Sequence, residues 1–398
     1  MTPDARPTPS LRGTPKEQDP PRTEVDDLRE WKRRLSLLLD YARQMSIRKE
    51  LDPLLGTVVN AAREILQAER CTVFLLDKKK NELWARVATG DHDIRVPADK
   101  GIVGQTIMER RVINIADAYA DDRFNPEVDR ASGFRTRSIL TAPLAKMRGE
   151  VLGALQVLNK KGGPFQENDE KMFILFAEQA ASALANAQLY EELQAAYKDT
   201  IFRLAAAAEF KDHDTRNHLE RVSRYSRLIA AAVGMEKEWC DRLALASPMH
   251  DIGKLGVPDA VLKKPGKLDE EEWKEMHRHP NHGAEILANS DNELLQMSER
   301  IARSHHEKWD GTGYPTGLKG DAIPLEARIV AVADVFDALT SRRCYKPAFS
   351  LDNALKIIYE GSGKHFDPAL VYAFKQVLDS IVQVMEKFTD RPEIPPLT

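Results

Sequence analysis

Hydrophobic and polar positions along the chain separate a polar start from a mixed α/β stretch. Six prolines fall within the first 21 positions, so residues 1–24 are expected to form a disordered tail. Apolar residues at helical spacing then predict a helix over residues 25–50. Residues 51–190 show both periodicities, which predicts a mixed α/β domain. Its predicted elements are helices at 54–66, from 101 and from about 168, and strands at 71–77, 83–88, 138–144 and 151–159.

The helix that begins near residue 168 is predicted to be unusually long. From Phe173 to Ala208 apolar residues step by three or four, and no proline or glycine occurs between residues 165 and 233. Residues 191–210 are therefore expected to form a linker helix between two domains. A stripe of this length favours pairing with the same helix of a second subunit, and the alternative is packing of the helix on its own domain.

Beyond residue 200 the helical period dominates, and strand-like alternation is nearly absent. Residues 211–398 are expected to form an all-α domain built as a helical bundle. The predicted helices are 217–233, 236–249, 269–278, 281–288, 292–304, 324–341, 351–361 and 367–385.

Composition excludes several classes of protein. The formal net charge of -4 argues against a protein that coats nucleic acid, and no apolar run approaches the ~20 residues of a membrane-spanning helix. The first residues lack the apolar stretch of a secretory signal. Three cysteines far apart leave no disulfide framework and no CxxC zinc site. We therefore expect a cytoplasmic protein whose partners are neither nucleic acid nor membrane.

Histidines concentrate in the helical region, where eight of the ten lie between His213 and His306. Together with acidic residues they form five short segments, at 214–218, 250–251, 279–282, 305–310 and 334–337. Imidazole and carboxylate together suit divalent iron, manganese, cobalt or zinc, and ligands from separate helices meet in the cores of some bundles. The pattern predicts a site for more than one metal ion.

Asp334 is the clearest candidate ligand, because it lies among apolar residues of a predicted helix and a buried carboxylate needs a partner. Two adjacent metal ions activate water and clamp the oxygens of a phosphoryl group. Each segment alone has an ordinary explanation. His305 and His306 suit a helix C-terminus, and Asp214 with His218 suits a surface pair. Their concentration in one region favours the metal site.

Two of these segments carry family signatures. HDIGK at 250–254 and HHEKWDGTGYP at 305–315 resemble the HD-GYP family, and the likeness extends to ADVFDALT at 333–340 and GKHFDP at 363–368. The resemblance implies a phosphodiesterase that hydrolyses cyclic di-GMP, to pGpG or on to GMP. It also implies two or three divalent metal ions, iron or manganese first among them.

The resemblance assigns roles residue by residue. The implied metal ligands are His218, His250, Asp251, His279, His305, His306 and Asp334, with Asp214 at a place where some members have a further ligand. Asp251 would bridge the metals, Lys254 would contact the phosphate, and Asp337 would relay a proton. The implied substrate-binding residues are Lys254, Tyr314, Arg343 and Lys346. His213 and His277 are expected at the surface, and His282 beside the ligands or at the surface.

Residues 51–190 resemble a GAF domain, on the segments GIVGQTI, VINIADAYADDRF and VLGALQVLNKK. The resemblance implies an α+β sensor domain with an antiparallel sheet and flanking helices. Asn159-Lys160, Phe165 and Asp169-Glu170 repeat a pattern that accompanies a Lys–Asp salt bridge in GAF domains of cyclic-nucleotide phosphodiesterases. Lys160 and Asp169 would form that pair beside a cyclic nucleotide or another small molecule. The alternative is that these acidic residues only start a helix.

These features together predict a dimeric cytoplasmic enzyme in which a GAF sensor regulates a cyclic di-GMP phosphodiesterase. Two alternatives stay open: a hydrolase of another cyclic dinucleotide, and a non-catalytic module that binds cyclic di-GMP or docks on a partner. Retention of Lys254 and of the metal positions argues against the second alternative, since a degenerate site need not keep them.

Overall fold

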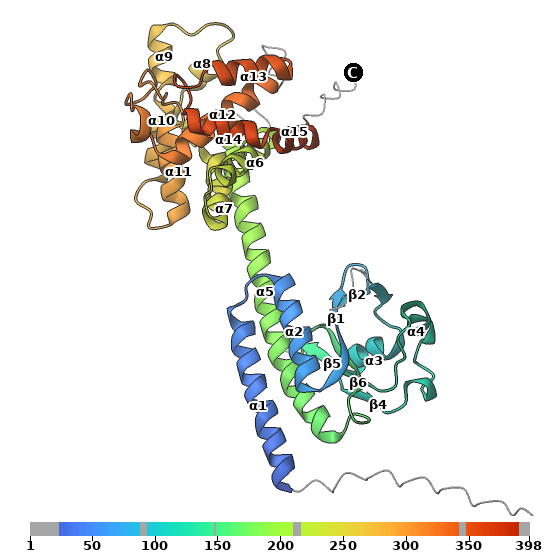
Figure 1. The fold of residues 1–398 in the computed structure, drawn as a ribbon. Helices are drawn as coiled ribbons and strands as arrows, with labels where there is room; N and C mark the ends of the chain where they lie inside the picture. Colours follow the sequence, from blue (N-terminus) through green and yellow to red (C-terminus); the bar gives the residue numbers. More distant parts are fainter. Residues whose placement is uncertain (1–23, 88–93, 147–148, 210–215, 342–347, 390–398) are drawn as a thin grey trace, which may run out of the picture. The chain divides into compact units, whose positions relative to one another are not determined.

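The computed structural model describes residues 24–87, 94–146, 149–209, 216–341 and 348–389. The chain divides into two compact units, Met1–Leu193 and Gln194–Thr398. The division falls inside α5 (Glu167–Glu209), a helix of 43 residues without a proline or glycine (Figure 1). Each unit has a hydrophobic core of its own.

The described part of unit 1 contains one six-stranded antiparallel sheet, in the order β3-β2-β1-β6-β5-β4. Its strands are β1 (Ala68–Asp77), β2 (Glu82–Val87), β3 (Ile94–Pro97), β4 (Ile113–Ile115), β5 (Ile139–Ala145) and β6 (Val151–Lys160). The helices of the unit, besides the first part of α5, are α1 (Glu24–Ile47), α2 (Leu51–Ile65), α3 (Gly101–Glu109), η1 (Ala118–Ala120) and α4 (Pro126–Ser132).

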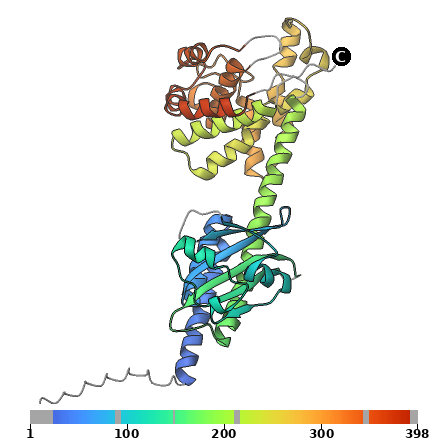
Figure 2. The same cartoon turned by 90° about the vertical axis from the view of Figure 1, so that its right-hand side faces the viewer.

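Strand β1 shows how the alternating pattern creates two different faces of the sheet. Val73 and Leu75 join the main core, in which α1, α2 and α5 cover one face (Figures 1 and 2). Thr72 and Phe74 point to the opposite face, where they line a cavity together with residues of α3 and α4. The period of two along a strand therefore separates the core of unit 1 from its cavity.

The described part of unit 2 is helical, apart from one isolated bridge. After the last turns of α5 come α6 (Arg216–Ala232), α7 (Lys237–Ala246), η2 (Ser247–Met249), η3 (Ile252–Gly256), α8 (Asp259–Leu262), α9 (Glu270–Met276), α10 (His279–Leu287), α11 (Glu293–Ser304), η4 (Gly320–Ala322), α12 (Leu325–Thr340), α13 (Leu351–Glu360), α14 (Pro368–Gln376) and α15 (Leu378–Lys387). The nearly apolar α12 runs through the core, with Ile329, Val330 and Phe336 fully buried.

The fold class predicted from the sequence is confirmed: an α+β unit with an antiparallel sheet precedes a helical unit, and a long helix joins them. Some details differ. The short strands β3 and β4 were not predicted, since three or four residues carry too little alternation. The single helix predicted over 367–385 is broken at Val377 into α14 and α15. None of the described helices combines the length and the apolar character that crossing a bilayer requires.

Candidate metal centre

Six separate segments of unit 2 bring histidine and carboxylate side chains to one place. The residues are Glu209 at the end of α5, His218 on α6, His250 and Asp251 between η2 and η3, His279 at the start of α10, His305 and His306 after α11, and Asp334 on α12. All of them except Asp334 fall into two clusters, in each of which the ligand atoms lie within 4.8 Å of one another. We call Asp251, His279, His305 and His306 the His279 group, and Glu209, His218 and His250 the His218 group.

Four of the histidines are oriented by an acceptor at Nδ1. The Nδ1 atom lies 2.9 Å from the Ser247 carbonyl in His250, 2.8 Å from the Met276 carbonyl in His279, 3.0 Å from the Ala302 carbonyl in His305 and 2.9 Å from a carboxylate oxygen of Asp337 in His218. A carbonyl oxygen only accepts, so Nδ1 carries the proton and Nε2 presents a lone pair. This is the tautomer that a metal-binding histidine needs.

The lone pairs converge on buried space around Asp251. The Nε2 atoms of His250, His279 and His305 are buried, and none of them has hydrogen-bond geometry with a described residue. Asp251 Oδ1 lies 3.1 Å from Nε2 of His279 and 3.3 Å from Nε2 of His305. Unsatisfied buried nitrogen and oxygen atoms are costly, so a donor set of this kind fits a divalent cation.

Asp251 stands between the two groups. Its Oδ1 atom faces the His279 group, whereas its Oδ2 atom lies 3.5 Å from Nε2 of His250 in the His218 group. Asp334 Oδ1 lies 3.8 Å from Nε2 of both His218 and His250. One carboxylate is thus shared between the groups, and a second adds an oxygen to the His218 group.

Electrostatics keep these groups in the protonation states that metal binding requires. Burial favours the neutral form of Asp251, yet Lys254 and His250 hold the pKa of its carboxyl well below the usual range. Burial and the neighbouring His305 lower the pKa of His306, so this imidazole is neutral near pH 7. The Lys254 ammonium lies 2.7 Å from Asp251 Oδ2 and 3.5 Å from a carboxylate oxygen of Glu209. Lys254 is therefore in the centre itself, at the boundary of the two groups.

Asp337, which was expected to relay a proton, lies one helical turn after Asp334 on α12. It is buried on α12, where the Arg221 guanidinium donates to Oδ1 at 2.6 Å and to Oδ2 at 2.9 Å. His218 and Ser341 also contact Oδ2. Burial on its own raises the pKa of this carboxyl, but the hydrogen bonds from His218 and Arg221 bring it below the ordinary value. Both oxygens of Asp337 are thus engaged in hydrogen bonds, and one of them faces Nδ1 of His218.

Gly253, in the first signature motif, allows η3 to pack closely against α10. A Cβ on Gly253 would lie 1.9 Å from the His279 carbonyl oxygen and 2.4 Å from the Gly283 nitrogen. Only a residue without a side chain lets η3 approach α10 this closely. The close approach places Asp251, two residues before Gly253, beside Nε2 of His279.

The loop that carries the second motif is fixed by Glu307. This buried carboxylate accepts hydrogen bonds from the Thr316 N–H and hydroxyl at 2.8 and 2.7 Å, and from the Leu318 N–H at 3.0 Å. Gly313 packs so tightly that a Cβ would lie 2.3 Å from the Lys308 nitrogen. The fold of the loop directs Tyr314 toward the histidines.

Tyr314 is part of an aromatic stack beside the His279 group. Its ring stacks on His306 with a centroid distance of 4.7 Å and on His277 with 3.9 Å. Burial raises the pKa of the Tyr314 hydroxyl, so it remains a hydrogen-bond donor at neutral pH. His277 was expected at the surface, but it is half-buried in this stack. His282 is half-buried too, with its ring against Gly256.

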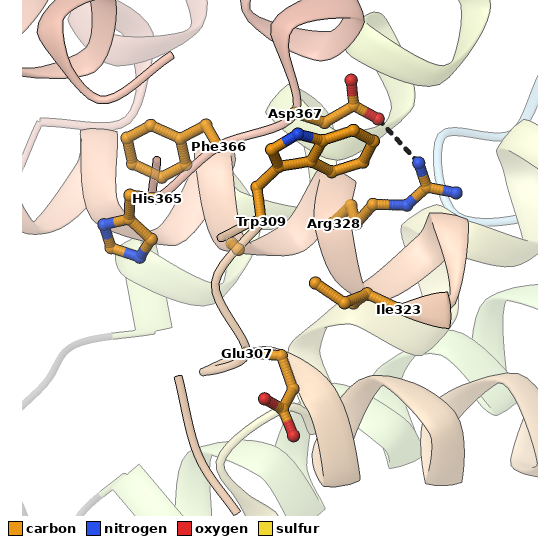
Figure 3. A pocket seen from close by; sticks show the side chains of 8 residues that line it. Glu307, Trp309, Ile323, Arg328, His365, Phe366 and Asp367 are labelled. Atoms are coloured by element: carbon orange, nitrogen blue, oxygen red, sulfur yellow. Dashed lines mark hydrogen bonds and ion pairs between the residues drawn. The ribbon is translucent and has the colours of Figure 1, made fainter. Parts of the chain in front are cut away.

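Figure 3 shows how the base of the same loop is held. The backbone N–H of Trp309 donates to the His365 carbonyl at 3.0 Å. The Trp309 ring lies 5.4 Å from the Arg328 guanidinium, which pairs with Asp367 at 2.7 Å (Figure 3). The cavity among these side chains measures about 10 Å³ and holds at most one water molecule. The side chains around the cavity support the loop, and the cavity itself is too small for a nucleotide.

The structure thus brings together seven of the residues expected as ligands: His218, His250, Asp251, His279, His305, His306 and Asp334. Asp214, Arg343 and Lys346 lie outside the described residues. Glu209 was missed, although Asp212, His213 and Asp214 follow it closely, because the sequence analysis took its candidate ligands from histidines and aspartates. Its only signal was a charged residue at the end of an alanine-rich apolar stripe.

In unit 1, Lys160 and Asp169 form an ion pair. Asp169 is 1% exposed and also receives the Arg34 guanidinium at 2.7 Å and the Gln166 N–H at 2.8 Å. Arg34 comes from α1 and was not predicted. The cluster therefore joins β6, α1 and the start of α5.

The cavity of unit 1 lies on the other face of the sheet and measures about 710 Å³. Phe74, Phe124 and Phe134 contribute apolar walls, and Arg70 and Lys100 contribute positive charge. Neither Lys160 nor Asp169 lines it. The ion pair therefore links elements of the fold and does not line the cavity.

Comparison with known protein families assigns both units. The GAF domain profile matches residues 50–184, and the HD domain profile matches residues 203–370. The chain carries a GAF domain followed by an HD domain. The candidate metal centre lies in the HD domain, and the 710 Å³ cavity lies in the GAF domain.

Curated relatives match about half of this chain. A protein of Xanthomonas campestris named cyclic di-GMP phosphodiesterase response regulator RpfG is 46% identical over 198 residues, covering 50% of this chain and 52% of that protein. A Vibrio cholerae cyclic di-GMP phosphodiesterase is 42% identical, covering 52% and 46%. A Vibrio cholerae 3'3'-cGAMP-specific phosphodiesterase 2 is 38% identical, covering 56% and 43%. The chain spans about half the length of these relatives.

Proposed function

We propose that the HD domain is a metal-dependent phosphodiesterase of the HD-GYP type that hydrolyses cyclic di-GMP. The observation that carries the proposal is the convergence of oriented Nε2 lone pairs on Asp251. Relatives 46% and 42% identical are named cyclic di-GMP phosphodiesterases. A buried set of imidazoles and carboxylates with an adjacent lysine suits attack on a phosphodiester.

We propose two divalent ions, iron or manganese, one in each of the two groups. His279, His305 and His306 would hold one, and His218, His250 and Asp334 would hold the other, with Asp251 between them. Bound ions of this kind supply Lewis acidity and lower the pKa of water. A third ion would need a further ligand such as Asp214, which lies outside the described residues.

Lys254 would stabilise negative charge that develops on the phosphoryl oxygens, since its ammonium already lies at the boundary of the two groups. Asp251 keeps Lys254 in place through their 2.7 Å contact. Tyr314 offers a ring and a hydroxyl for a base or phosphate of the substrate. Arg343 and Lys346 are proposed as further substrate contacts from the sequence resemblance. Asp337 is proposed to position His218.

Two other functions are kept as competitors. A relative 38% identical to this chain is named for 3'3'-cGAMP, so another cyclic dinucleotide is the first. A non-catalytic module that binds cyclic di-GMP or docks on a partner is the second. The retained ligand set and Lys254 favour an enzyme over such a module.

One experiment separates the three. The purified full chain, loaded anaerobically with Fe(II) or Mn(II), is incubated with cyclic di-GMP, 3'3'-cGAMP and cyclic di-AMP, and the products are chromatographed. We expect cyclic di-GMP to have the highest kcat/KM and to yield pGpG or GMP. A higher kcat/KM for another cyclic dinucleotide would mean that this dinucleotide, and not cyclic di-GMP, is the preferred substrate. Binding without turnover, with the metal content verified, would favour the module.

For the GAF domain we propose a small-molecule ligand in the 710 Å³ cavity, with a cyclic nucleotide as one candidate. The size of the cavity, its phenylalanine walls and the cations Arg70 and Lys100 suit a planar anion. Thermal unfolding of the full chain with cyclic AMP or cyclic GMP tests this. A rise in Tm that is lost in Arg70→Ala supports it, and no shift with either nucleotide removes cyclic nucleotides as candidates.

We further propose that the protein is a cytoplasmic homodimer paired along α5. Leu189, Leu193 and Leu204 are each more than half exposed on this helix. Light scattering after size-exclusion chromatography should give twice the chain mass, and Leu193→Glu should reduce it to one chain. A wild-type monomer at micromolar concentration would contradict the dimer.

A further inference from the structure

The last residue of α5 carries a carboxylate into the metal centre. Glu209 is 1% exposed, and its oxygen lies within 4.8 Å of ligand atoms of both His218 and His250. The preceding turn is anchored in the HD domain, since Phe202, Ala205 and Leu219 form a small buried cluster. Packing of this turn therefore fixes where the Glu209 side chain lies.

We propose that Glu209 is a ligand of the metal ion in the His218 group. The inference rests on the proposed metal-dependent function and adds a residue to its site. Two neutral imidazoles with carboxylates from Glu209 and Asp334 make a nitrogen and oxygen donor set that suits iron or manganese.

Lys254 lies between Glu209 and Asp251. The lysine ammonium is closer to Asp251, at 2.7 Å, than to Glu209, at 3.5 Å. One ammonium therefore faces two buried carboxylates, and Asp251 makes the shorter contact. A divalent cation beside His218 and His250 would place further positive charge close to both carboxylates.

The position of Glu209 also ties the metal site to the helix shared by both domains. The chain passes from the first compact unit to the second within α5, and Glu209 ends that helix. One residue of helix rises about 1.5 Å and turns about 100°, so unwinding the last turn would withdraw the carboxylate from His218 and His250. Occupancy of the His218 group is therefore set in part by the integrity of the end of α5.

The test counts metal per chain. Full-length wild type, Glu209→Gln and Glu209→Ala are loaded with Mn(II), passed over a desalting column and analysed by elemental mass spectrometry, with dissociation constants from competition with a chelating dye. We expect two ions per wild-type chain. We expect the weaker-bound ion to dissociate at least about tenfold more readily in both variants, since even outer-shell ligands change metal affinity by 10–100-fold.

Two controls isolate the carboxylate. Glu326→Gln removes another buried carboxylate of the HD domain, one paired with Arg300, and should keep two ions. Glu209→Ala combined with Ala207→Glu retains the charge of α5 at an exposed position and should still lose affinity. Unchanged metal content and affinity in Glu209→Gln would overturn the ligand role and leave Glu209 as a partner of Lys254. A wild type that binds no metal under any loading would instead remove the proposed function itself, and with it this inference.

Discussion

The Nδ1 atom of His218 lies 2.9 Å from Oδ2 of Asp337, so the imidazole turns its Nε2 atom toward Asp334 and His250. Three other histidines of the centre have the same arrangement with backbone carbonyls as acceptors. His218 alone among these four depends on a side chain for its orientation. The orientation of His218 can therefore be changed by a substitution at Asp337, which leaves every candidate ligand in place.

The first prediction concerns this orientation. Asp337→Asn should weaken metal binding at the His218 group by about 10–100-fold, because an amide can present its NH₂ to Nδ1 and no longer fixes the tautomer. Metal dissociation constants from dye competition measure this. The same variant should lower the free energy of unfolding by about 3–5 kcal/mol, because the buried Arg221 loses its carboxylate. Asp352→Asn, at an exposed site on α13, is the control. Unchanged metal affinity with reduced stability would leave Asp337 a purely structural role.

The second prediction separates the two groups. Asp251→Asn should lower occupancy of both ions, because its two oxygens face different groups. His279→Ala should mainly affect one ion, and His218→Ala mainly the other. Metal counts per chain together with turnover measure the difference. Equal loss of both ions in all three variants would point to a single cooperative site.

Much of this candidate centre was predictable because its residues belong to short motifs with unusual composition. His250 and Asp251 are adjacent in sequence, as are His305 and His306. Nearby residues position them: Gly253 lets the first motif approach α10, and the carbonyls of Ser247 and Ala302 orient the rings of His250 and His305. Glu209 could not be predicted, because its proximity to His218 arises only from the packing of the last turn of α5 against α6.

Arg221 and Arg34 support residues singled out by the sequence, and their contacts could not be predicted for the same reason. Arg221 reaches Asp337 over a separation of 116 residues. Arg34 reaches Asp169 over 135 residues. Periodicity predicts that such residues lie on a helix, but it does not reveal which distant carboxylate they meet.

The third prediction concerns Gly253. A Cβ there would collide with the His279 carbonyl and with the backbone of Gly283, so η3 and α10 must separate in Gly253→Ala. We expect the HD domain to lose about 1–3 kcal/mol of unfolding free energy, or more, and metal to be lost with it. Calorimetry and metal analysis measure both. Gly56→Ala, in an exposed and unobstructed position of α2, should instead be neutral or stabilising by up to about 1 kcal/mol. A Gly253→Ala variant with full stability and full metal content would show that the two segments separate at no cost.

The fourth prediction concerns the loop that presents Tyr314. Glu307→Gln removes a charged acceptor of three hydrogen bonds, from Thr316 and Leu318, while it leaves the metal ligands in place. We expect KM for cyclic di-GMP to rise while the metal content stays at the wild-type value. Steady-state kinetics with metal analysis measure this. Glu299→Gln, on the neighbouring helix α11, is the control. Loss of metal in Glu307→Gln would instead mean that the loop also holds the His279 group together.

The fifth prediction concerns acid unfolding of the GAF domain. Burial alone raises the pKa of Asp169, but Lys160, the Gln166 N–H and Arg34 together bring it below the ordinary value. A lowered folded-state pKa means that the cluster contributes stability above the unfolded pKa of about 3.9 and loses it as pH falls through the folded-state value. Asp169→Asn should therefore be less stable than wild type by about 3–5 kcal/mol at pH 7, and the gap should narrow below about pH 4.

Urea unfolding of the GAF domain between pH 2 and pH 7 measures that gap. Glu167→Gln, whose carboxylate is exposed and lies two residues earlier on the same helix, should follow the wild-type curve at every pH. Because Asp169 is charged in the folded state throughout the upper part of this range, the gap must be constant there and must decline only on the acid side. A gap that widens as pH falls would mean that the folded state holds Asp169 protonated, and the ion-paired cluster with Lys160 and Arg34 would then be the wrong description of this site.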